Sequence, residues 1–140
     1  MKRAIITKTF YFLSSLTVGL AIYSCAAIAP PSGGPDDEIA PKFIGSIPES
    51  GSTQFKGGKV ELKFSEYIDK KSIGRAISIS PQPDPPVDLQ YKDDEVHLFF
   101  PEKLLSDQTY IISINRNLTD ERNVALDQSK QIAFSTGSII

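Results

Sequence analysis

The sequence predicts an all-β domain, an antiparallel sandwich of about seven strands, for residues 42–140. After residue 41, apolar and polar residues alternate in seven short runs, which is the pattern of strands with one buried face. Turn formers such as Pro, Gly and Asp separate these runs, which mostly begin 10 to 18 residues apart. All ten prolines follow residue 25, and because prolines interrupt helices, long helices are not expected there.

The strands are expected at residues 43–47, 60–64, 77–79, 87–91, 96–100, 110–114 and 132–134. Because successive side chains of a strand point to opposite faces, the alternation places one set of apolar side chains inward. This set contains Leu62, Phe64, Leu98, Ile112 and Phe134. At most a single helical turn is expected, at 70–75 or at 103–105. Residues 115–130 form the longest irregular connection, and loops of that length are often functional or mobile.

A different kind of segment precedes this domain. Residues 1–8 carry three basic residues and no acidic one, and residues 10–22 form a mostly apolar run. A basic start, a short apolar run and small residues at its end are typical of a secretory signal peptide. The 14 residues of 9–22 make about 21 Å of helix, which is short against about 30 Å of hydrocarbon. An uncleaved membrane anchor is therefore the weaker alternative, beside a plain secretory signal.

The only cysteine of the chain, Cys25, follows this run directly. Ile22, Ser24 and Cys25 resemble the lipobox of bacterial lipoproteins, although Tyr23 is bulkier than the usual residue. The resemblance implies that 1–24 is a cleaved signal peptide and that the thiol of Cys25 is lipidated. The implied partner is a membrane, and the implied location is the outer membrane, on its periplasmic or surface face. A single cysteine also excludes an intramolecular disulfide and a Cys-based zinc site.

Residues 25–41 are expected to form a disordered tether, with four prolines, two glycines and the acidic run 36–38. In some Gram-negative lipoproteins, acidic residues soon after the lipidated cysteine direct export to the cell surface, which is an alternative to a simple spacing role. Cleavage removes three of the 15 basic residues, so 12 basic and 17 acidic residues leave a net charge near −5. Such a chain lacks the clustered basic face that nucleic acid requires.

Several stretches resemble the bacterial Ig-like domain first described in S-layer proteins. The turn at 47–52 and the strand at 60–66, which ends in Phe-Ser-Glu, resemble its opening. Residues 105–110 resemble the start of its sixth strand, and 132–137 resemble its last strand. Arg122 departs from the pattern, because the family often has Gly there.

The resemblance covers about 41–137 and implies that the predicted sandwich is Ig-like. The same leader, Gly-Gly-Pro tether and domain occur together at the start of longer outer-membrane lipoproteins in the family. The chain is thus expected to be either a whole protein or the N-terminal part of such a lipoprotein.

Tyr110 opens the sixth expected strand. In Ig-like sandwiches a Tyr near the start of that strand often bonds backbone across a corner. We therefore predict a structural role for Tyr110, with exposure at a recognition surface as the alternative.

The reactive side chains argue against catalysis. His97 is the only histidine, and alternation places it outward, between the inward Val96 and Leu98. One histidine builds no His-based metal site, and no Ser and acid are placed by sequence to complete a triad with it. The acidic runs 93–95 and 120–121 do not have the spacing of a calcium-binding loop. We predict no catalytic residue, no cofactor and no metal.

Two classes of function remain. The predicted one is a non-catalytic Ig-like module of the cell envelope, acting as a spacer or binding protein or glycan. The alternative is an envelope carbohydrate-active enzyme, or its accessory domain, that uses surface carboxylates.

The interaction surface is expected at Asn117, Asp120 and Arg122 of the long connection and at Phe99 and Ile111. Alternation leaves these two apolar side chains outward, and adjacent strands would join them into one patch. Cover by the Pro-rich connection or by a following domain is the alternative.

Overall fold

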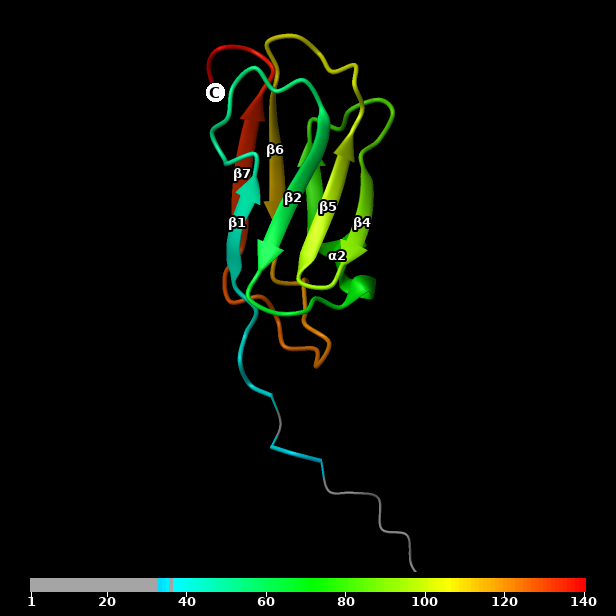
Figure 1. Cartoon of the computed structure of the whole chain (residues 1–140), viewed down its shortest axis with the longest axis vertical. Coiled ribbons are helices and arrows are strands. Elements are labelled where there is room, and N and C mark those ends of the chain that lie inside the picture. Colours follow the sequence, from blue (N-terminus) through cyan, green and yellow to red (C-terminus); the bar gives the residue numbers. More distant parts are fainter. Residues whose placement is uncertain (1–32, 36) are drawn as a thin grey trace, which may run out of the picture. The chain divides into compact units, whose positions relative to one another are not determined.

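A computed structural model shows two antiparallel β-sheets packed against each other (Figure 1). It describes residues 33–35 and 37–140, so the leader, Cys25 and most of the expected tether lie outside the described residues. The described elements are β1 (Phe43–Ile47), β2 (Gly58–Phe64), α2 (Lys70–Ala76), β3 (Ile77–Ser80), β4 (Asp88–Lys92), β5 (Glu95–Phe100), β6 (Thr109–Ile114) and β7 (Lys130–Ser135). Each of the seven expected strands is present, with ends that differ by at most two residues.

The strands divide into a four-stranded sheet of order β1-β2-β5-β4 and a three-stranded sheet of order β3-β6-β7. Every ladder between neighbouring strands is antiparallel. The chain changes sheet after β2, after β3 and after β5, so strands that follow each other in sequence often lie in different layers. The arrangement confirms the predicted Ig-like sandwich.

The hydrophobic core fills the space between the two sheets. Val60 and Leu62 of β2 pair with Leu98 and Val96 of β5, and none of these four side chains is exposed. The five side chains predicted to point inward are all exposed by 1% or less, which confirms the predicted register of their strands. Fully burying a Leu or Phe side chain contributes about 1.5–3 kcal/mol, so this layer supplies much of the stability.

The helix α2 has seven residues, or about two turns, whereas at most a single helical turn was expected in this region. Its start and its buried side are determined by local residues. Asp69 caps its start, because a carboxylate oxygen accepts the N–H of Lys71 at 3.1 Å. Ile73 and Ala76 are buried on the inner side of the helix. No helix among residues 33–35 and 37–140 is long and apolar enough to cross a membrane.

The strand β1 differs from the simple alternation. Phe43 packs edge-on against Phe64 with ring centroids 5.9 Å apart, but Ile47 is 67% exposed. The ladder with β2 shifts between Phe43 and Gly45. Because one extra residue in a strand exchanges inward and outward positions, this irregularity turns Ile47 away from the core.

Tyr110 has the predicted structural role. Its side chain is 1% exposed, and its hydroxyl accepts the N–H of Leu105 at 3.2 Å. The bond ties the connection before β6 to the strand itself. Tyr110 is therefore a core residue that fixes a corner, and the alternative of an exposed recognition residue is excluded.

Candidate functional site

Phe99 and Ile111 do not form a common patch. Both point outward, with 36% and 39% of their surface exposed, as alternation predicts. However, Phe99 lies on β5 of the four-stranded sheet and Ile111 on β6 of the three-stranded sheet. The outward faces of the two sheets of a sandwich point away from each other, so the expected patch is wrong. The reason is that the connection between β5 and β6 crosses from one sheet to the other.

The β6–β7 connection, drawn in orange in Figure 1, is packed against the domain. Leu118 and Leu126 anchor it, because neither side chain is exposed. Asn117 and Arg122 are exposed, but Asp120 is only 2% exposed. The expectation that Asp120 belongs to an accessible surface is therefore wrong, since its side chain turns inward to accept N–H groups of its own loop.

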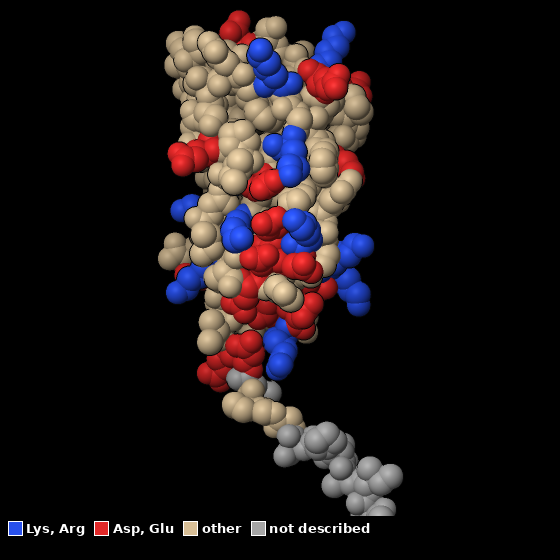
Figure 2. All heavy atoms as spheres, viewed as in Figure 1, with Lys and Arg blue, Asp and Glu red and all other residues tan. Residues whose placement is uncertain are grey.

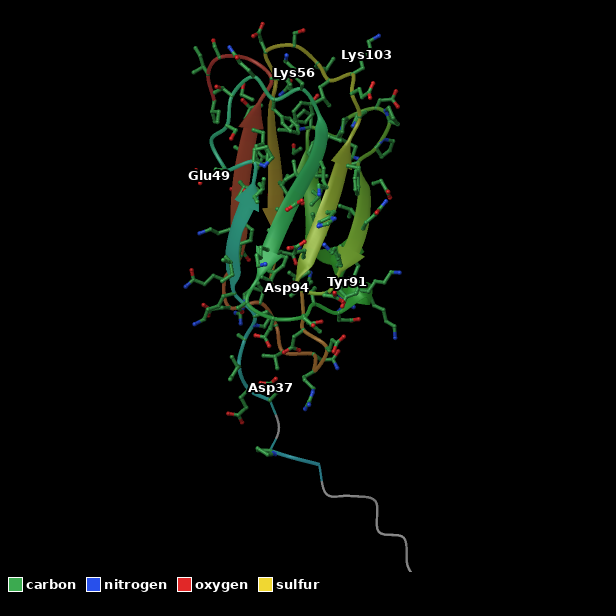
Figure 3. The ribbon with its side chains drawn as sticks, in the orientation of Figure 1. Asp37, Glu49, Lys56, Tyr91, Asp94 and Lys103 are labelled. Carbon is green, nitrogen blue, oxygen red and sulfur yellow. The ribbon has the colours of Figure 1, made fainter. Side chains whose placement is uncertain are left out.

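Asp120 meets two other carboxylates at this end of the sandwich. Asp37 comes from the stretch expected as tether, and Glu66 follows β2. One oxygen of each carboxylate lies within 4.8 Å of the others. We call the cavity that they share, of about 350 Å³, the acidic end pocket; it is lined by Asp37, Glu66, Tyr67, Asp120, Glu121 and Arg122. Figure 3 shows Asp37 below the end of the sandwich that carries the β6–β7 connection.

The electrostatics of the acidic end pocket are unfavourable for three negative charges. Burial raises the pKa of Glu66, and the neighbouring Asp120 and Asp37 raise it further. Among the described residues, the ion pairs within 4.0 Å involve other carboxylates and none of these three. Acidic side chains gather toward this lower end of the face seen in Figure 2.

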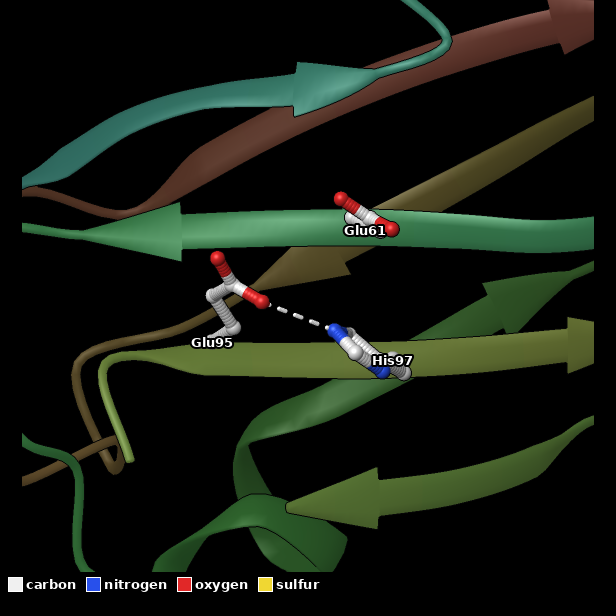
Figure 4. A group of neighbouring side chains, drawn as sticks. All are labelled: Glu61, Glu95 and His97. Atoms are coloured by element: carbon white, nitrogen blue, oxygen red, sulfur yellow. Dashed lines mark hydrogen bonds and ion pairs between the residues drawn. The ribbon is translucent and has the colours of Figure 1, made fainter. Parts of the chain in front are cut away.

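A second group, the outer-face cluster of Glu61, Glu95 and His97, lies on the outer surface of the four-stranded sheet (Figure 4). His97 Nε2 is 2.9 Å from Glu95 Oε2, Lys63 Nζ is 3.6 Å from Glu95 Oε1, and Lys59 pairs with Glu61. The hydrogen bond with His97 is the main cause that lowers the pKa of Glu95, and that with Lys59 lowers the pKa of Glu61. His97 points outward as predicted, into a cluster whose charges are balanced.

The outer-face cluster is not arranged like the carboxylate pair of a glycosidase. A general acid needs a raised pKa, whereas the pKa values of Glu61 and Glu95 are lowered. In both groups the nearest oxygens lie within 4.8 Å of one another. Carboxyl groups that flank a glycosidic bond are about 5–9.5 Å apart, because the sugar and a water must fit between them. The outer-face cluster therefore suits ion pairing better than proton transfer to a sugar.

The sequence did not indicate that the carboxylates of Asp37 and Glu66 lie close to each other. Asp37 was included in the expected tether, and Glu66 stood only as the end of a strand motif. The available signal was the acidic run 36–38, which lies a few residues before β1 and therefore near the domain.

The two-layer antiparallel arrangement and the buried Tyr110 corner define an Ig-like sandwich. The chain belongs to the bacterial Ig-like domain family, whose sequence profile matches residues 37–136. This confirms the resemblance found in the sequence, and the match begins at Asp37, within the stretch expected as tether. No curated protein matches the chain in sequence.

Similar solved structures include a part of the bacterial S-layer protein SbsC, with 12% identity and a TM-score of 0.46 over 73% of this chain. The chain covers only 24% of that S-layer fragment. A methionine-rich copper resistance protein from Escherichia coli, PcoC, has 15% identity and a TM-score of 0.47 over 69% of this chain and 98% of its own. An L,D-transpeptidase from Mycobacterium smegmatis has 17% identity and a TM-score of 0.46 over 71% of this chain and 41% of its own.

Proposed function

We propose that this protein is a non-catalytic Ig-like module of the bacterial cell envelope, held on the outer membrane by lipid at Cys25 and acting as a spacer. The observation that carries the proposal is the order of segments. A leader and the lipobox-like Cys25 precede a short Pro/Gly-rich stretch, and an Ig-like domain matched over 37–136 follows. Membership of the family supports an envelope location, and the lipobox-like residues support the membrane as partner.

The path of the chain through the domain supports a spacing role. Seven antiparallel strands are an odd number of passes, so the chain enters β1 at one end of the sandwich and leaves β7 at the other (Figure 1). A strand of six or seven residues spans about 20 Å. A module of this kind therefore separates whatever precedes residue 37 from whatever lies beyond β7 by at least that distance.

Binding of an envelope protein or glycan is the second part of the proposal. Phe99 and Ile111 offer separate apolar contacts on opposite faces, and Asn117 and Arg122 offer polar contacts at the end of the domain. These contacts are small and scattered, which favours spacing over recognition as the main role.

Lipid attachment is tested by the Cys25→Ser variant expressed in a Gram-negative host with labelled palmitate. The wild-type chain should carry label and sediment with the outer membrane, whereas the variant should carry none. A matched control, Cys25→Ser with Ser32→Cys, keeps one cysteine but moves it away from the lipobox-like residues, and it should also stay unlabelled. Label retained in either variant contradicts lipidation at Cys25.

The absence of catalysis is tested on the processed wild-type protein with peptidoglycan and envelope polysaccharides as substrates. No turnover is expected. Turnover that is lost in Glu66→Gln or Glu95→Gln would instead establish the carbohydrate-active alternative.

A further inference from the structure

Three carboxylates from distant parts of the chain converge in the acidic end pocket. Asp37 lies before β1, Glu66 directly after β2 and Asp120 in the β6–β7 connection. Their oxygens lie within 4.8 Å of one another, although Asp37 and Glu66 are about half-buried rather than free in solvent. Like charges held so close repel unless something neutralises them.

Asp120 is the member whose surroundings are incomplete. One carboxylate oxygen, Oδ1, accepts the N–H groups of Arg122 and Val124, each at 2.8 Å. The other, Oδ2, has no hydrogen-bond partner among the described residues and is closed to solvent, within a side chain that is 2% exposed. A buried carboxylate oxygen without a partner is costly, because it has lost water and gained nothing.

Among the described residues, no Lys or Arg forms an ion pair with the three carboxylates of this pocket. In the outer-face cluster, Lys59 and Lys63 stand within 4.0 Å of the carboxylates. In the acidic end pocket, Arg122 lines the cavity, but the described residues show no ion pair between it and Asp37, Glu66 or Asp120. In each group the ligand atoms lie within 4.8 Å of one another, and among the described residues only the carboxylates of the outer-face cluster form ion pairs with lysine.

The spacing and the ligand type indicate which cation fits. Ca²⁺ binds six to eight oxygens at about 2.4 Å in a flexible geometry, so two oxygens on opposite sides of one ion are about 4.8 Å apart. Mg²⁺ binds at about 2.1 Å, which limits that separation to about 4.2 Å and requires a strict octahedron. The pocket offers three carboxylates, one oxygen of each lying within 4.8 Å of the others, and the flexible shell of Ca²⁺ accommodates such a group without the strict octahedron that Mg²⁺ requires.

We propose that the acidic end pocket is a Ca²⁺ site, with Asp37, Glu66 and Asp120 Oδ2 as its protein ligands and water completing the shell. The ion ties the stretch before β1 to the end of β2 and to the β6–β7 connection. These three segments already meet through backbone hydrogen bonds, from Ser65 N–H to Lys42 O, from Asp69 N–H to Thr119 O and from Asp127 N–H to Pro41 O, and the ion adds a further tie between them. The proposal does not depend on lipid attachment at Cys25.

The experiment is calcium titration of the purified full chain after EGTA treatment, by calorimetry and by thermal melting. We expect one ion per chain, saturation at about 0.1–1 mM as in other extracellular modules, and a melting temperature that rises with CaCl₂ concentration. MgCl₂ at equal concentration should raise the melting temperature less.

Two variants and one control separate a built site from a general acidic surface. Asp120→Asn keeps an oxygen that can accept the N–H groups of Arg122 and Val124, but it removes the charge. Glu66→Gln removes charge from a less buried position and decides the matter if the first variant does not fold. Each should weaken calcium affinity about tenfold or more. Glu61→Gln, in the outer-face cluster, should bind calcium as the wild-type chain does.

Absence of a calorimetric signal and of a melting shift at 10 mM CaCl₂ would overturn the proposal. Unchanged affinity in Glu66→Gln, or an equal loss in the Glu61→Gln control, would overturn the assignment to this pocket. An equal response to MgCl₂ would overturn the choice of Ca²⁺.

Discussion

The alternation along β2 predicts that neighbouring positions differ strongly in their contribution to folding. Leu62 is fully buried between the sheets, whereas the side chain of Lys63 is 55% exposed on the outer face. Leu62→Ala removes three carbons, worth about 0.8 kcal/mol each, and leaves a cavity in the core. We expect a loss of about 3–4 kcal/mol in the free energy of unfolding.

Lys63→Ala should cost much less. Its amine lies 3.6 Å from Asp94 and 3.6 Å from Glu95, but exposed ion pairs contribute only about 0–1 kcal/mol. We expect a loss of about 0.5 kcal/mol, close to that of ordinary surface substitutions.

Urea unfolding, followed by far-UV circular dichroism, measures both changes. With a slope of about 1–1.5 kcal/mol/M, the urea midpoint of Leu62→Ala should fall by about 2–4 M, while that of Lys63→Ala should fall by less than about 0.5 M. Equal shifts for the two variants would refute the register, because a slip of one residue exchanges the inner and outer faces.

Three further predictions address single contacts. Tyr110→Phe should lose about 1 kcal/mol with its hydrogen bond to the Leu105 N–H, whereas Tyr67→Phe, on an exposed side chain, should melt as the wild-type chain does. Gly74→Ala should stabilise the domain by about 0.5–1 kcal/mol, since Gly74 lies inside α2 and an added Cβ meets nothing within 4 Å; an unchanged or lower melting temperature would contradict this. Because the pKa of folded Glu95 lies below its ordinary value of 4.5, its stabilising effect is present above pH 4.5 and is lost as the pH falls through the folded value. Urea midpoints from pH 7 to pH 3 should therefore fall more steeply in the wild-type chain than in Glu95→Gln, and parallel curves would contradict this.

The strands were predictable because their signal is local. In β2 and β5 a buried apolar residue stands at every second position, so the period of two shows both the strand and its inner face. The strand that contains Ile47 was predictable, but the outward orientation of its side chain was not. The irregular pairing of β1 with β2 that turns this side chain outward leaves no mark in the alternation. The buried role of Tyr110 could be inferred because its place at the start of a strand is shared by Ig-like sandwiches.

The candidate sites could not be predicted to the same extent, because they depend on which strands enter which sheet. Phe99 and Ile111 lie on strands that are consecutive in sequence, yet the chain changes layer between them. The acidic end pocket joins Asp37 to Asp120, which are far apart in the sequence and meet only when the β6–β7 connection folds back toward the start of β1. No spacing rule within a single loop describes such a group.

We propose that this Ig-like domain is held on the membrane by a lipid attached to Cys25. Mass spectrometry of the N-terminal tryptic peptide from protein purified out of outer membranes tests it most directly. We expect a peptide that begins at Cys25 and carries a diacylglyceryl group on its thiol. A tryptic peptide that begins at Thr9 and runs on through Cys25, or one that begins at Cys25 with an unmodified thiol, would contradict it.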